Sequence, residues 1–344
     1  MKMTFRWYGK NDTIPLDYIR QIPGMTGVVT AVYDVAPGKA WKEKSVLALK
    51  NACTKKGLEM EVIESVPVHE DIKLGRGKRD EYIEIYKQNI ELLGRNGVKV
   101  ICYNFMPVFD WVRTILNKKN SDGSMSLAYR NSDIKKINPR TLSLPGWDES
   151  YSHDQLNELL DAYAGMSHDQ LFQNYVYFLE RILPTCESVG VKMAVHPDDP
   201  PWDLFGLPRI VSTEKDLDRL FKACPSPANG LTFCTGSLGA GRPDLPCLAK
   251  KYADRIYFAH LRNIEFSGEQ DFAESAHLSS CGSLDMYAIV KALVKGGFDG
   301  YVRPDHGRNI WSETGKPGYG LFDRALGAAY LNGLFESAHK ELKR

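Results

Sequence analysis

The sequence predicts an α/β fold, specifically a (β/α)8 TIM barrel with a helical and loop insertion between its fourth and fifth strands. Two observations carry this prediction. Short apolar, β-branched runs alternate with amphipathic segments of helix length along almost the whole chain, which is typical of a parallel sheet covered by helices. Eight such units are present, and eight parallel strands close into a barrel. We expect one barrel domain over residues 1–344.

Four strands and three helices are expected in the first third of the chain. The strands cover residues 4–8, 27–32, 60–64 and 98–105. The second of these is continuous in apolar residues, as expected for a strand covered on both faces. The helices cover residues 15–24 and 39–56, and a third has Ile83, Tyr86, Ile90 and Leu93 on one face and ends at Gly97.

The alternation is interrupted between residues 106 and 190, where a single helix would suffice. Residues 117–130 are polar and turn-rich, whereas residues 148–163 are acidic with a helical pattern. Ser167 and Gln170 form the pattern of a capping box that opens a long barrel helix. Residues of about 110–165 are therefore left as an insertion. The insertion is either a solvated excursion from the surface, or a lid or subunit contact.

The alternation resumes after Gly190. Strands are expected at residues 191–196, 230–234, 255–260 and 301–305, and helices at about 213–223, 244–252, 284–295 and 321–339. A doubly wound open sheet is the competing layout. That layout more often has a glycine fingerprint after its first strand, and residues 8–11 do not match one.

The composition limits which binding partners and which cellular compartment are expected for the protein. The formal net charge of +1 gives no global field that would select nucleic acid or an anionic membrane. No apolar run approaches the roughly 20 residues of a membrane span, and the N-terminus has no signal-peptide pattern. Seven scattered cysteines without a repeated CxxC spacing indicate reduced thiols. We expect a cytoplasmic protein.

Four consecutive strands end in side chains that can bind a metal. These are His196, Cys234, His260 and Asp305. A single histidine or cysteine at a strand end is more often structural, but barrel active sites lie at the C-terminal strand ends, and four such side chains there are a less probable coincidence. Two imidazoles, a thiolate and a carboxylate favour Fe²⁺, Mn²⁺, Co²⁺ or Zn²⁺ over Mg²⁺ or Ca²⁺.

Strand alternation adds charged neighbours to these ligands. Residues two apart share a face, so Arg262, Asp198 and Arg303 are expected beside the metal. Two arginines indicate an anionic substrate, although each could instead pair with a nearby carboxylate. His306, just past the last strand, is a candidate acid or base because its pKa can lie near neutrality.

Other strand ends and loops supply candidate substrate contacts. Trp7, His69 and Asn104 follow the first, third and fourth strands. The glycine-rich residues 235–241, which include Ser237, lack the lysine of a P-loop and are interpreted as a close approach to substrate. Residues 315–320 form a second glycine-rich loop, and its Tyr319 could close over the site or the loop could be a simple connector.

Several stretches together resemble the mannonate dehydratase family, metal-dependent lyases with a xylose-isomerase-like barrel. They include residues 5–9 (FRWYG), 65–73 (SVPVHEDIK), 102–111 (CYNFMPVFDW), 195–201 (VHPDDPP), 233–237 (FCTGS), 260–263 (HLRN) and 303–307 (RPDHG). The resemblance places the family's metal ligands on His196, Cys234, His260 and Asp305. It implies dehydration of D-mannonate to 2-keto-3-deoxy-D-gluconate in hexuronate (glucuronate) catabolism, with Mn²⁺ or Fe²⁺, and we expect a homo-oligomer, a dimer or larger.

The chemistry of this reaction assigns tasks to the remaining candidates. A base must remove the C2 proton, an acid must protonate the departing C3 hydroxyl, and a metal with an arginine must stabilise an enediolate-like intermediate. His306 and Tyr319 are expected to share the proton transfers, with Asp305 contributing to one of them. A sugar isomerase or epimerase on the same barrel is the alternative, although such sites usually use several carboxylates. A binding protein without activity is the second alternative.

Overall fold

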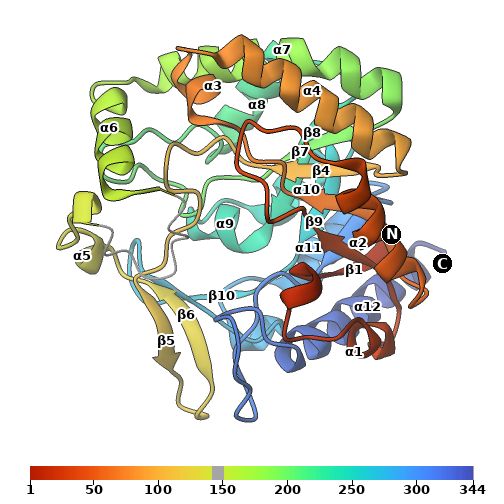
Figure 1. Cartoon of the computed structure of the whole chain (residues 1–344). Coiled ribbons are helices and arrows are strands. Elements are labelled where there is room, and N and C mark those ends of the chain that lie inside the picture. The colour runs from red at the N-terminus through yellow and green to blue at the C-terminus, as the bar shows by residue number, and fades with distance from the viewer. Residues whose placement is uncertain (142–150, 344) are drawn as a thin grey trace.

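A closed barrel of eight parallel strands forms the centre of the protein (Figure 1). The computed structural model describes residues 1–141 and 151–343. Around the barrel the strands are β1 (Lys2–Arg6), β12 (Tyr301–Arg303), β9 (Ile256–His260), β8 (Asn229–Cys234), β7 (Lys192–Val195), β4 (Val100–Tyr103), β3 (Glu59–Glu64) and β2 (Met25–Thr30). Each neighbouring pair is parallel. The predicted (β/α)8 barrel is confirmed.

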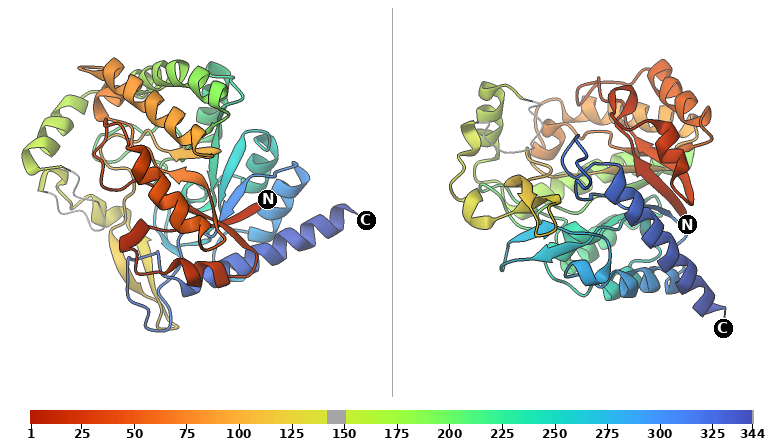
Figure 2. Two further views of the ribbon diagram at one scale, coloured as in Figure 1. Left: turned by 45° about the vertical axis from the view of Figure 1, so that its right-hand side comes forward. Right: turned by 90° about the horizontal axis from the view of Figure 1, so that it is seen from below.

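Helices cover the outside of this barrel, close to where the sequence predicts them. They are α1 (Leu16–Gln21), α2 (Glu43–Thr54), α4 (Arg79–Arg95), α7 (His168–Val189), α8 (Glu214–Ala223), α10 (Leu245–Lys251), α11 (Met286–Lys295) and α12 (Phe322–Leu342). The predicted capping box opens α7, where the Ser167 side chain accepts a hydrogen bond from the Gln170 N–H. The C-terminal end of α12 projects beyond the rest of the molecule (Figure 2). Within the described residues, no helix combines the length and apolar character that a membrane crossing requires.

Short elements join these units. The 3₁₀ turn η1 (Gly9–Asn11) follows β1, and α3 (Glu70–Leu74) precedes α4. The helix α9 (Thr235–Ala240) follows β8 directly, and the 3₁₀ turn η3 (Ser279–Cys281) precedes α11. Residues 235–241 were predicted to be a glycine-rich loop that approaches the substrate, and that prediction was wrong about the loop. Cys234 acts as the N-cap of α9, and its Sγ accepts a hydrogen bond from the Ser237 N–H.

The barrel interior is a small apolar core beneath the strand ends. Val29, Val62, Val100, Ala194 and Phe258 fill it, and each is at most 3% exposed. The larger core lies between strands and helices. Because this interior cluster is apolar, charged groups that enter the barrel are expected at its two ends.

A second sheet lies beside the C-terminal end of the barrel. It has four antiparallel strands in the order β10 (Ile264–Phe266), β11 (Phe272–Glu274), β6 (Met125–Tyr129) and β5 (Ile115–Lys119). The last two form a hairpin within the predicted insertion, followed by α5 (Asn131–Ile134), η2 (Pro139–Thr141) and α6 (His153–Tyr163). The sequence pattern did not predict these strands. Residues 142–150, including the start of the helix predicted at 148–163, lie outside the described residues.

Candidate active site

The C-terminal strand ends surround a cavity of about 540 Å³. Most of its wall comes from the last residue of a strand or the residues just after it. The lining residues are Arg6, Tyr8, Asn11, Tyr33, Glu64, Ser65, Cys102, Tyr103, Asn104, Met106, Asp110, Trp111, Leu116, His196, Asp199, Arg262, Arg303, Asp305, His306, Lys316, Pro317 and Tyr319. The cavity therefore has the size and position of a TIM-barrel active site.

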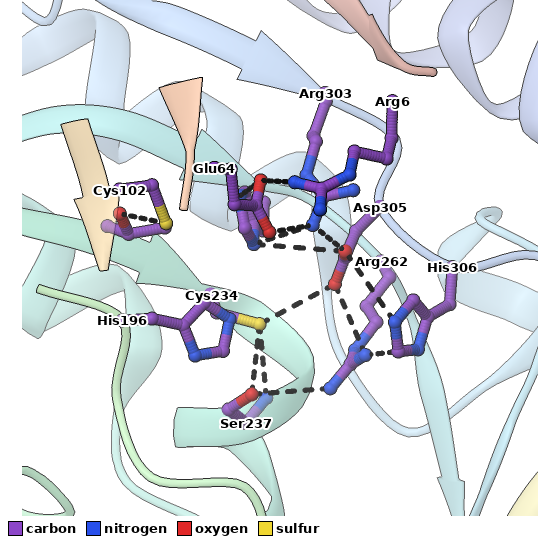
Figure 3. Close-up of polar contacts among 12 residues, drawn as sticks. Arg6, Glu64, Cys102, His196, Cys234, Ser237, Arg262, Arg303, Asp305 and His306 are labelled. Atoms are coloured by element: carbon purple, nitrogen blue, oxygen red, sulfur yellow. Dashed lines mark hydrogen bonds and ion pairs between the residues drawn. The ribbon is translucent and has the colours of Figure 1, made fainter. Parts of the chain in front are cut away.

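The four predicted metal ligands come together at the base of this cavity. One ligand atom each from His196, Cys234 and His260 lies within 4.8 Å of the others. The Asp305 carboxylate joins them, with Oδ2 3.7 Å from Cys234 Sγ and Oδ1 3.8 Å from His260 Nδ1. Figure 3 shows His196, Cys234 and Asp305 around one space. We refer to these four residues as the strand-end group.

The strand-end group fits a divalent metal ion. His196 Nδ1 lies 2.7 Å from the Pro197 carbonyl oxygen, so this nitrogen carries the proton and Nε2 is left with its lone pair. His260 is fully buried, and its Nε2, which lies 3.5 Å from Glu64 Oε2, makes no hydrogen bond in the described part of the chain. An unpaired buried nitrogen is costly, and metal ligation would satisfy it.

A second group of possible ligands, Glu64, Cys102 and His260, shares one histidine with the first. Glu64 already accepts a hydrogen bond from Arg303 Nη2 at 2.9 Å and lies 3.2 Å from Arg6 Nη1. Burial raises the pKa of the Cys102 thiol, which keeps it protonated. Two guanidinium charges and a neutral thiol make this second group the poorer cation site.

Asp305 is placed by an unusual backbone conformation. It follows β12 with a φ of +57°, in the left-handed region that aspartate tolerates better than most residues. Both Asp305 and His306 line the cavity as a result. Burial raises the pKa of Asp305, but the charges of Arg303 and Arg262 outweigh it and hold that pKa well below its usual range. The carboxylate is therefore ionised, as a metal ligand must be.

Both predicted arginines line the cavity and also pair with carboxylates. Arg303 Nη2 lies 2.7 Å from Asp305 and 2.9 Å from Glu64. Arg262 Nη2 lies 2.7 Å from Asp199, and its Nη1 lies 3.2 Å from Asp305. A Cβ at position 236 would collide with Arg262 Nε, so the close approach provided by the glycine-rich stretch is to this arginine.

His306 and Tyr319 form a hydrogen-bonded pair beside the strand-end group. His306 Nε2 lies 2.8 Å from the Tyr319 hydroxyl oxygen. Burial lowers the pKa of His306, and the charge of Arg262 adds to this effect. Burial likewise raises the pKa of Tyr319. Both groups are therefore neutral at physiological pH before substrate binds, which is the starting state required for exchanging a proton.

The remaining predicted contacts divide into three cases. Asn104 lines the cavity. Ser237 does not line the cavity and is fully buried. Its hydroxyl donates to the cavity-lining residue Asp199 at 3.0 Å and lies 3.1 Å from Cys234 Sγ. Trp7 and His69 lie elsewhere: Trp7 belongs to the hydrophobic core, whereas His69 caps α3 and stacks on Tyr82 at 3.7 Å.

Several charged residues of the site were not predicted. Arg6 and Glu64 end their strands inside the cavity, and strand alternation could have identified Arg6 in place of its neighbour Trp7. Asp199 lines the cavity instead of the predicted Asp198, which is buried and accepts hydrogen bonds from the Val211 N–H and the Ser212 hydroxyl. Alternation failed there because β7 ends at residue 195.

A set of buried ion pairs connects residues that line the cavity to residues outside its wall. Arg113 donates to Asp199 at 2.6 Å and to Glu274 at 2.9 Å, and all three side chains are at most 1% exposed. Arg262 joins both carboxylates, at 2.7 and 3.4 Å. We refer to Arg113, Asp199, Arg262 and Glu274 as the buried charge network. Two of its members come from outside the barrel: Arg113 precedes β5, and Glu274 ends β11.

Comparison with known proteins gives a consistent result along the whole chain. A family model described as D-mannonate dehydratase (UxuA) matches residues 1–344. "Mannonate dehydratase 2" of Halalkalibacterium halodurans is 52% identical over 342 residues, covering 98% of this chain and 99% of the relative. The mannonate dehydratase of Thermotoga maritima is 50% identical over 359 residues, covering 100% and 99%.

Solved structures agree with these relatives. The crystal structure of mannonate dehydratase from Streptococcus suis serotype 2 has a TM-score of 0.92 and 46% identity, and the match covers 100% of this chain and 95% of that one. A D-tagatose 3-epimerase-like protein has a TM-score of 0.55 at 12% identity, covering 99% and 100%. At that identity the second likeness shows the barrel fold alone.

Proposed function

The chain belongs to the D-mannonate dehydratase family, and from this premise we propose how its residues remove water from D-mannonate. The enzyme is a hydro-lyase that acts on a sugar acid and leaves 2-keto-3-deoxy-D-gluconate. One observation carries the residue assignment: His196 and Asp305 of the strand-end group line the same cavity as the His306–Tyr319 pair. The isomerase or epimerase alternative is not favoured, because proteins of that kind resemble this chain in fold alone.

We propose that His196, Cys234, His260 and Asp305 hold one divalent metal ion, Mn²⁺ or Fe²⁺. The donor set supports this choice, because imidazole and thiolate ligands select such ions over Mg²⁺ and Ca²⁺. A bound ion would supply positive charge where negative charge develops on the substrate carboxylate. The hydrogen bond of 3.5 Å from the Ser237 N–H to Cys234 Sγ stabilises the thiolate form that ligation needs.

We propose that Arg262, Arg303 and Asn104 contact the substrate, and we add Arg6. The carboxylates that pair with the arginines fix the direction of each guanidinium, which suits them to orient an anionic ligand. Arg6 is supported by its Nε, which is buried without a hydrogen-bond partner among the described residues. Trp7 and His69 are not included, because neither lines the cavity.

We propose that His306 and Tyr319 exchange protons with the substrate. Their hydrogen bond of 2.8 Å allows a proton to pass between them, and both line the cavity. Asp305 lies 3.9 Å from His306 Nε2 and is already paired with Arg303. We therefore assign Asp305 to metal binding rather than to a proton transfer of its own.

We also propose a single domain, a homo-oligomer and a cytoplasmic location. The single domain is supported by the insertion, which contributes Asp110, Trp111 and Leu116 to the cavity wall.

The homo-oligomer is supported by an exposed apolar patch of Trp311, Phe322 and Leu326, which are 70%, 39% and 50% exposed. The cytoplasmic location is supported by the seven cysteines, all of which are free thiols.

The assignment is tested by keto-acid formation from D-mannonate. Protein stripped with EDTA should form no product, and added Mn²⁺ or Fe²⁺ should restore product formation. Substrate that is bound but returned unchanged by metal-loaded protein would indicate a binding protein. Conversion of D-mannonate to an isomeric sugar acid would instead support the isomerase alternative.

A further inference from the structure

The side chain of Arg324 is buried at the start of α12, where it donates hydrogen bonds to three backbone carbonyl oxygens. It is the third residue of that helix and is 1% exposed. Its Nε donates to Gly320 at 2.6 Å, and its Nη2 donates to Tyr319 at 2.6 Å. Its Nη1 donates at 3.2 Å to Arg6, which ends β1 and lies 318 residues earlier in the chain. One guanidinium therefore joins the loop before α12 to the end of a barrel strand.

This guanidinium is an unusual buried charge, because it has no ionic partner. Within residues 1–141 and 151–343, Arg324 forms no ion pair with a carboxylate, and the adjacent Asp323 pairs with Arg308 at 2.9 Å. Removing a charge from water without a counter-charge is unfavourable, and the helix dipole disfavours a cation in the first turn. Burial lowers the pKa of Arg324 to about 10, so the side chain is still charged at neutral pH.

The two segments that Arg324 joins both carry residues of the cavity wall, Tyr319 and Arg6. The Tyr319 hydroxyl oxygen lies 2.8 Å from His306 Nε2, and its ring stands edge-on to the Tyr8 ring at 5.1 Å. Arg6 Cζ lies 5.0 Å from the centre of the same Tyr8 ring. A shift of the backbone at residue 319 would therefore move the phenol relative to its neighbours in the cavity.

Packing fixes the direction of the Arg324 side chain. Its Cζ lies 4.0 Å from the centre of the ring of Phe5, which is fully buried. A Cβ at Gly307 would come within 3.1 Å of Arg324 Cγ, so the chain just after β12 lies directly against the arginine stem. The Gly307 N–H donates to the Gly318 carbonyl at 2.9 Å, which joins the two ends of the loop that precedes α12.

We propose that Arg324 is a positioning residue, which holds the Tyr319 loop against the end of β1 and so keeps the phenol hydroxyl in the cavity beside His306. The inference rests on the proposed function, because Arg324 has this task only if Tyr319 takes part in the reaction. Arg324 itself lies outside the cavity wall. A lysine should not replace it, because one ammonium group lacks the planar fork of donors that reaches three separate carbonyls.

The first measurement is the turnover of Arg324→Lys, which keeps the charge and removes the fork. Its kcat with D-mannonate should fall by about 10-fold or more, because misplacing a reacting group by about 1 Å has effects of this size or larger. Bound metal should stay within about twofold of wild type, because the strand-end group comes from other strands. Unchanged kcat in the folded variant would overturn the proposal.

Arg255→Lys is the matched control. Arg255 precedes β9 at the opposite end of the barrel, and it too donates to three backbone carbonyl oxygens, those of Pro225, Ser226 and Asn229. The substitution removes the same fork at a distance from the cavity. It should leave kcat unchanged, and a fall in kcat equal to that of Arg324→Lys would mean that any loss of such a fork slows the enzyme.

A double-mutant cycle with Tyr319→Phe separates positioning from general support of the fold. If Arg324 acts through the phenol hydroxyl, Arg324→Lys should lower kcat by less than about twofold once that hydroxyl is gone, because two residues that act as one unit are not additive. A residue that only supports the fold should lower kcat by the same factor in both backgrounds. That additive result would overturn the positioning role.

A second variant keeps the cycle available if Arg324→Lys does not fold. Arg324→Met removes the desolvated charge, and replacing a buried charge with an apolar residue of similar volume is often tolerated. The same dependence on Tyr319 is expected. Wild-type kcat in Tyr319→Phe alone would contradict the proton-exchange assignment under the proposed function. A slow Tyr319→Phe enzyme in which the effect of the Arg324 variant is undiminished would contradict the positioning role alone.

Discussion

The strand-end group and the buried charge network lie side by side but are built by different parts of the chain. The strand-end group follows from the barrel, because parallel strands end at the same edge and their last residues meet there. The network depends on Arg113 and Glu274, which come from segments outside the barrel. We infer that the barrel supplies the chemistry, whereas Arg113 and Glu274 from the added segments fix the positions of Asp199 and Arg262 in the cavity wall.

The largest expected effect is the loss of a metal ligand. Cys234→Ser should remove most of the bound metal and lower kcat/KM by about 10³-fold, equivalent to about 4 kcal/mol of transition-state stabilisation. Metal analysis and keto-acid formation check this. Cys102→Ser, a buried cysteine of the second ligand group, should keep its metal. Loss of metal in Cys102→Ser alone would move the site to the group with Glu64.

Substitutions in the buried charge network should lower the free energy of unfolding more than substitutions in the strand-end group do. Arg113→Met leaves Asp199 and Glu274 buried with one fewer cation and should lower the free energy of unfolding by about 3 kcal/mol. Urea denaturation measures this. Arg140→Met, which breaks an exposed ion pair with Asp161 in the same insertion, should change stability by less than about 1 kcal/mol. Equal effects would mean that the buried ion pairs of the network contribute no more to folding than an exposed ion pair does.

Removal of the imidazole should separate chemistry from metal binding. His306→Asn should lower kcat by about 10²-fold or more and leave the bound metal nearly unchanged, because the strand-end group stays intact. Metal analysis and steady-state kinetics check both. His69→Asn changes a histidine that lies outside the cavity and should leave kcat unchanged. Turnover like that of wild type in His306→Asn would exclude this residue from the mechanism.

Low pH should destabilise the folded protein, because it protonates the carboxylates of the buried charge network. Burial raises the pKa of Glu274, but Arg262, the His306 hydrogen bond and Arg113 lower it to about 2. A pKa lowered by folding adds stability above its unfolded value of about 4.3, and this stability is lost as pH falls towards 2, by up to about 1.4 kcal/mol per pH unit. Urea midpoints between pH 5 and 2 test this. The decline should be shallower in Glu274→Gln.

The parts of the site that were predictable from sequence are those governed by strand periodicity. His196, Cys234, His260 and Asp305 each lie at or just after the end of an apolar run, and the ends of parallel strands meet at one edge of a barrel, so one rule locates all four. The rule fails once a strand has ended, as with Asp198 and Asp199, because loop backbone has no fixed alternation. Glu274 ends a strand of only three residues, too short for any periodic signal.

Tertiary contacts decide the remaining cases. The Gly-rich residues after Cys234 form α9 because the thiol caps the helix and the missing side chain at Gly236 admits Arg262. Composition alone favours a loop at such a stretch. Likewise, the polar residues of the β5–β6 hairpin form strands because β6 pairs with β11, which lies more than 140 residues further along the chain.

The smallest expected effect concerns the loop between β12 and α12, which runs from the cavity to the surface of the protein. Residues 304–321 carry Tyr319 on the inner side and Trp311 on the outer side, where Trp311 packs on Phe322 at a ring separation of 5.5 Å. Trp311→Ser should weaken self-association in light scattering, because an exposed apolar patch is lost, and should leave kcat within about twofold. The Tyr18→Ser variant, which changes a 53% exposed tyrosine on α1, provides the control. A fall in kcat without a change in mass would mean that the outer side of the loop positions Tyr319 within each subunit, and the patch would then belong with the network rather than with an interface.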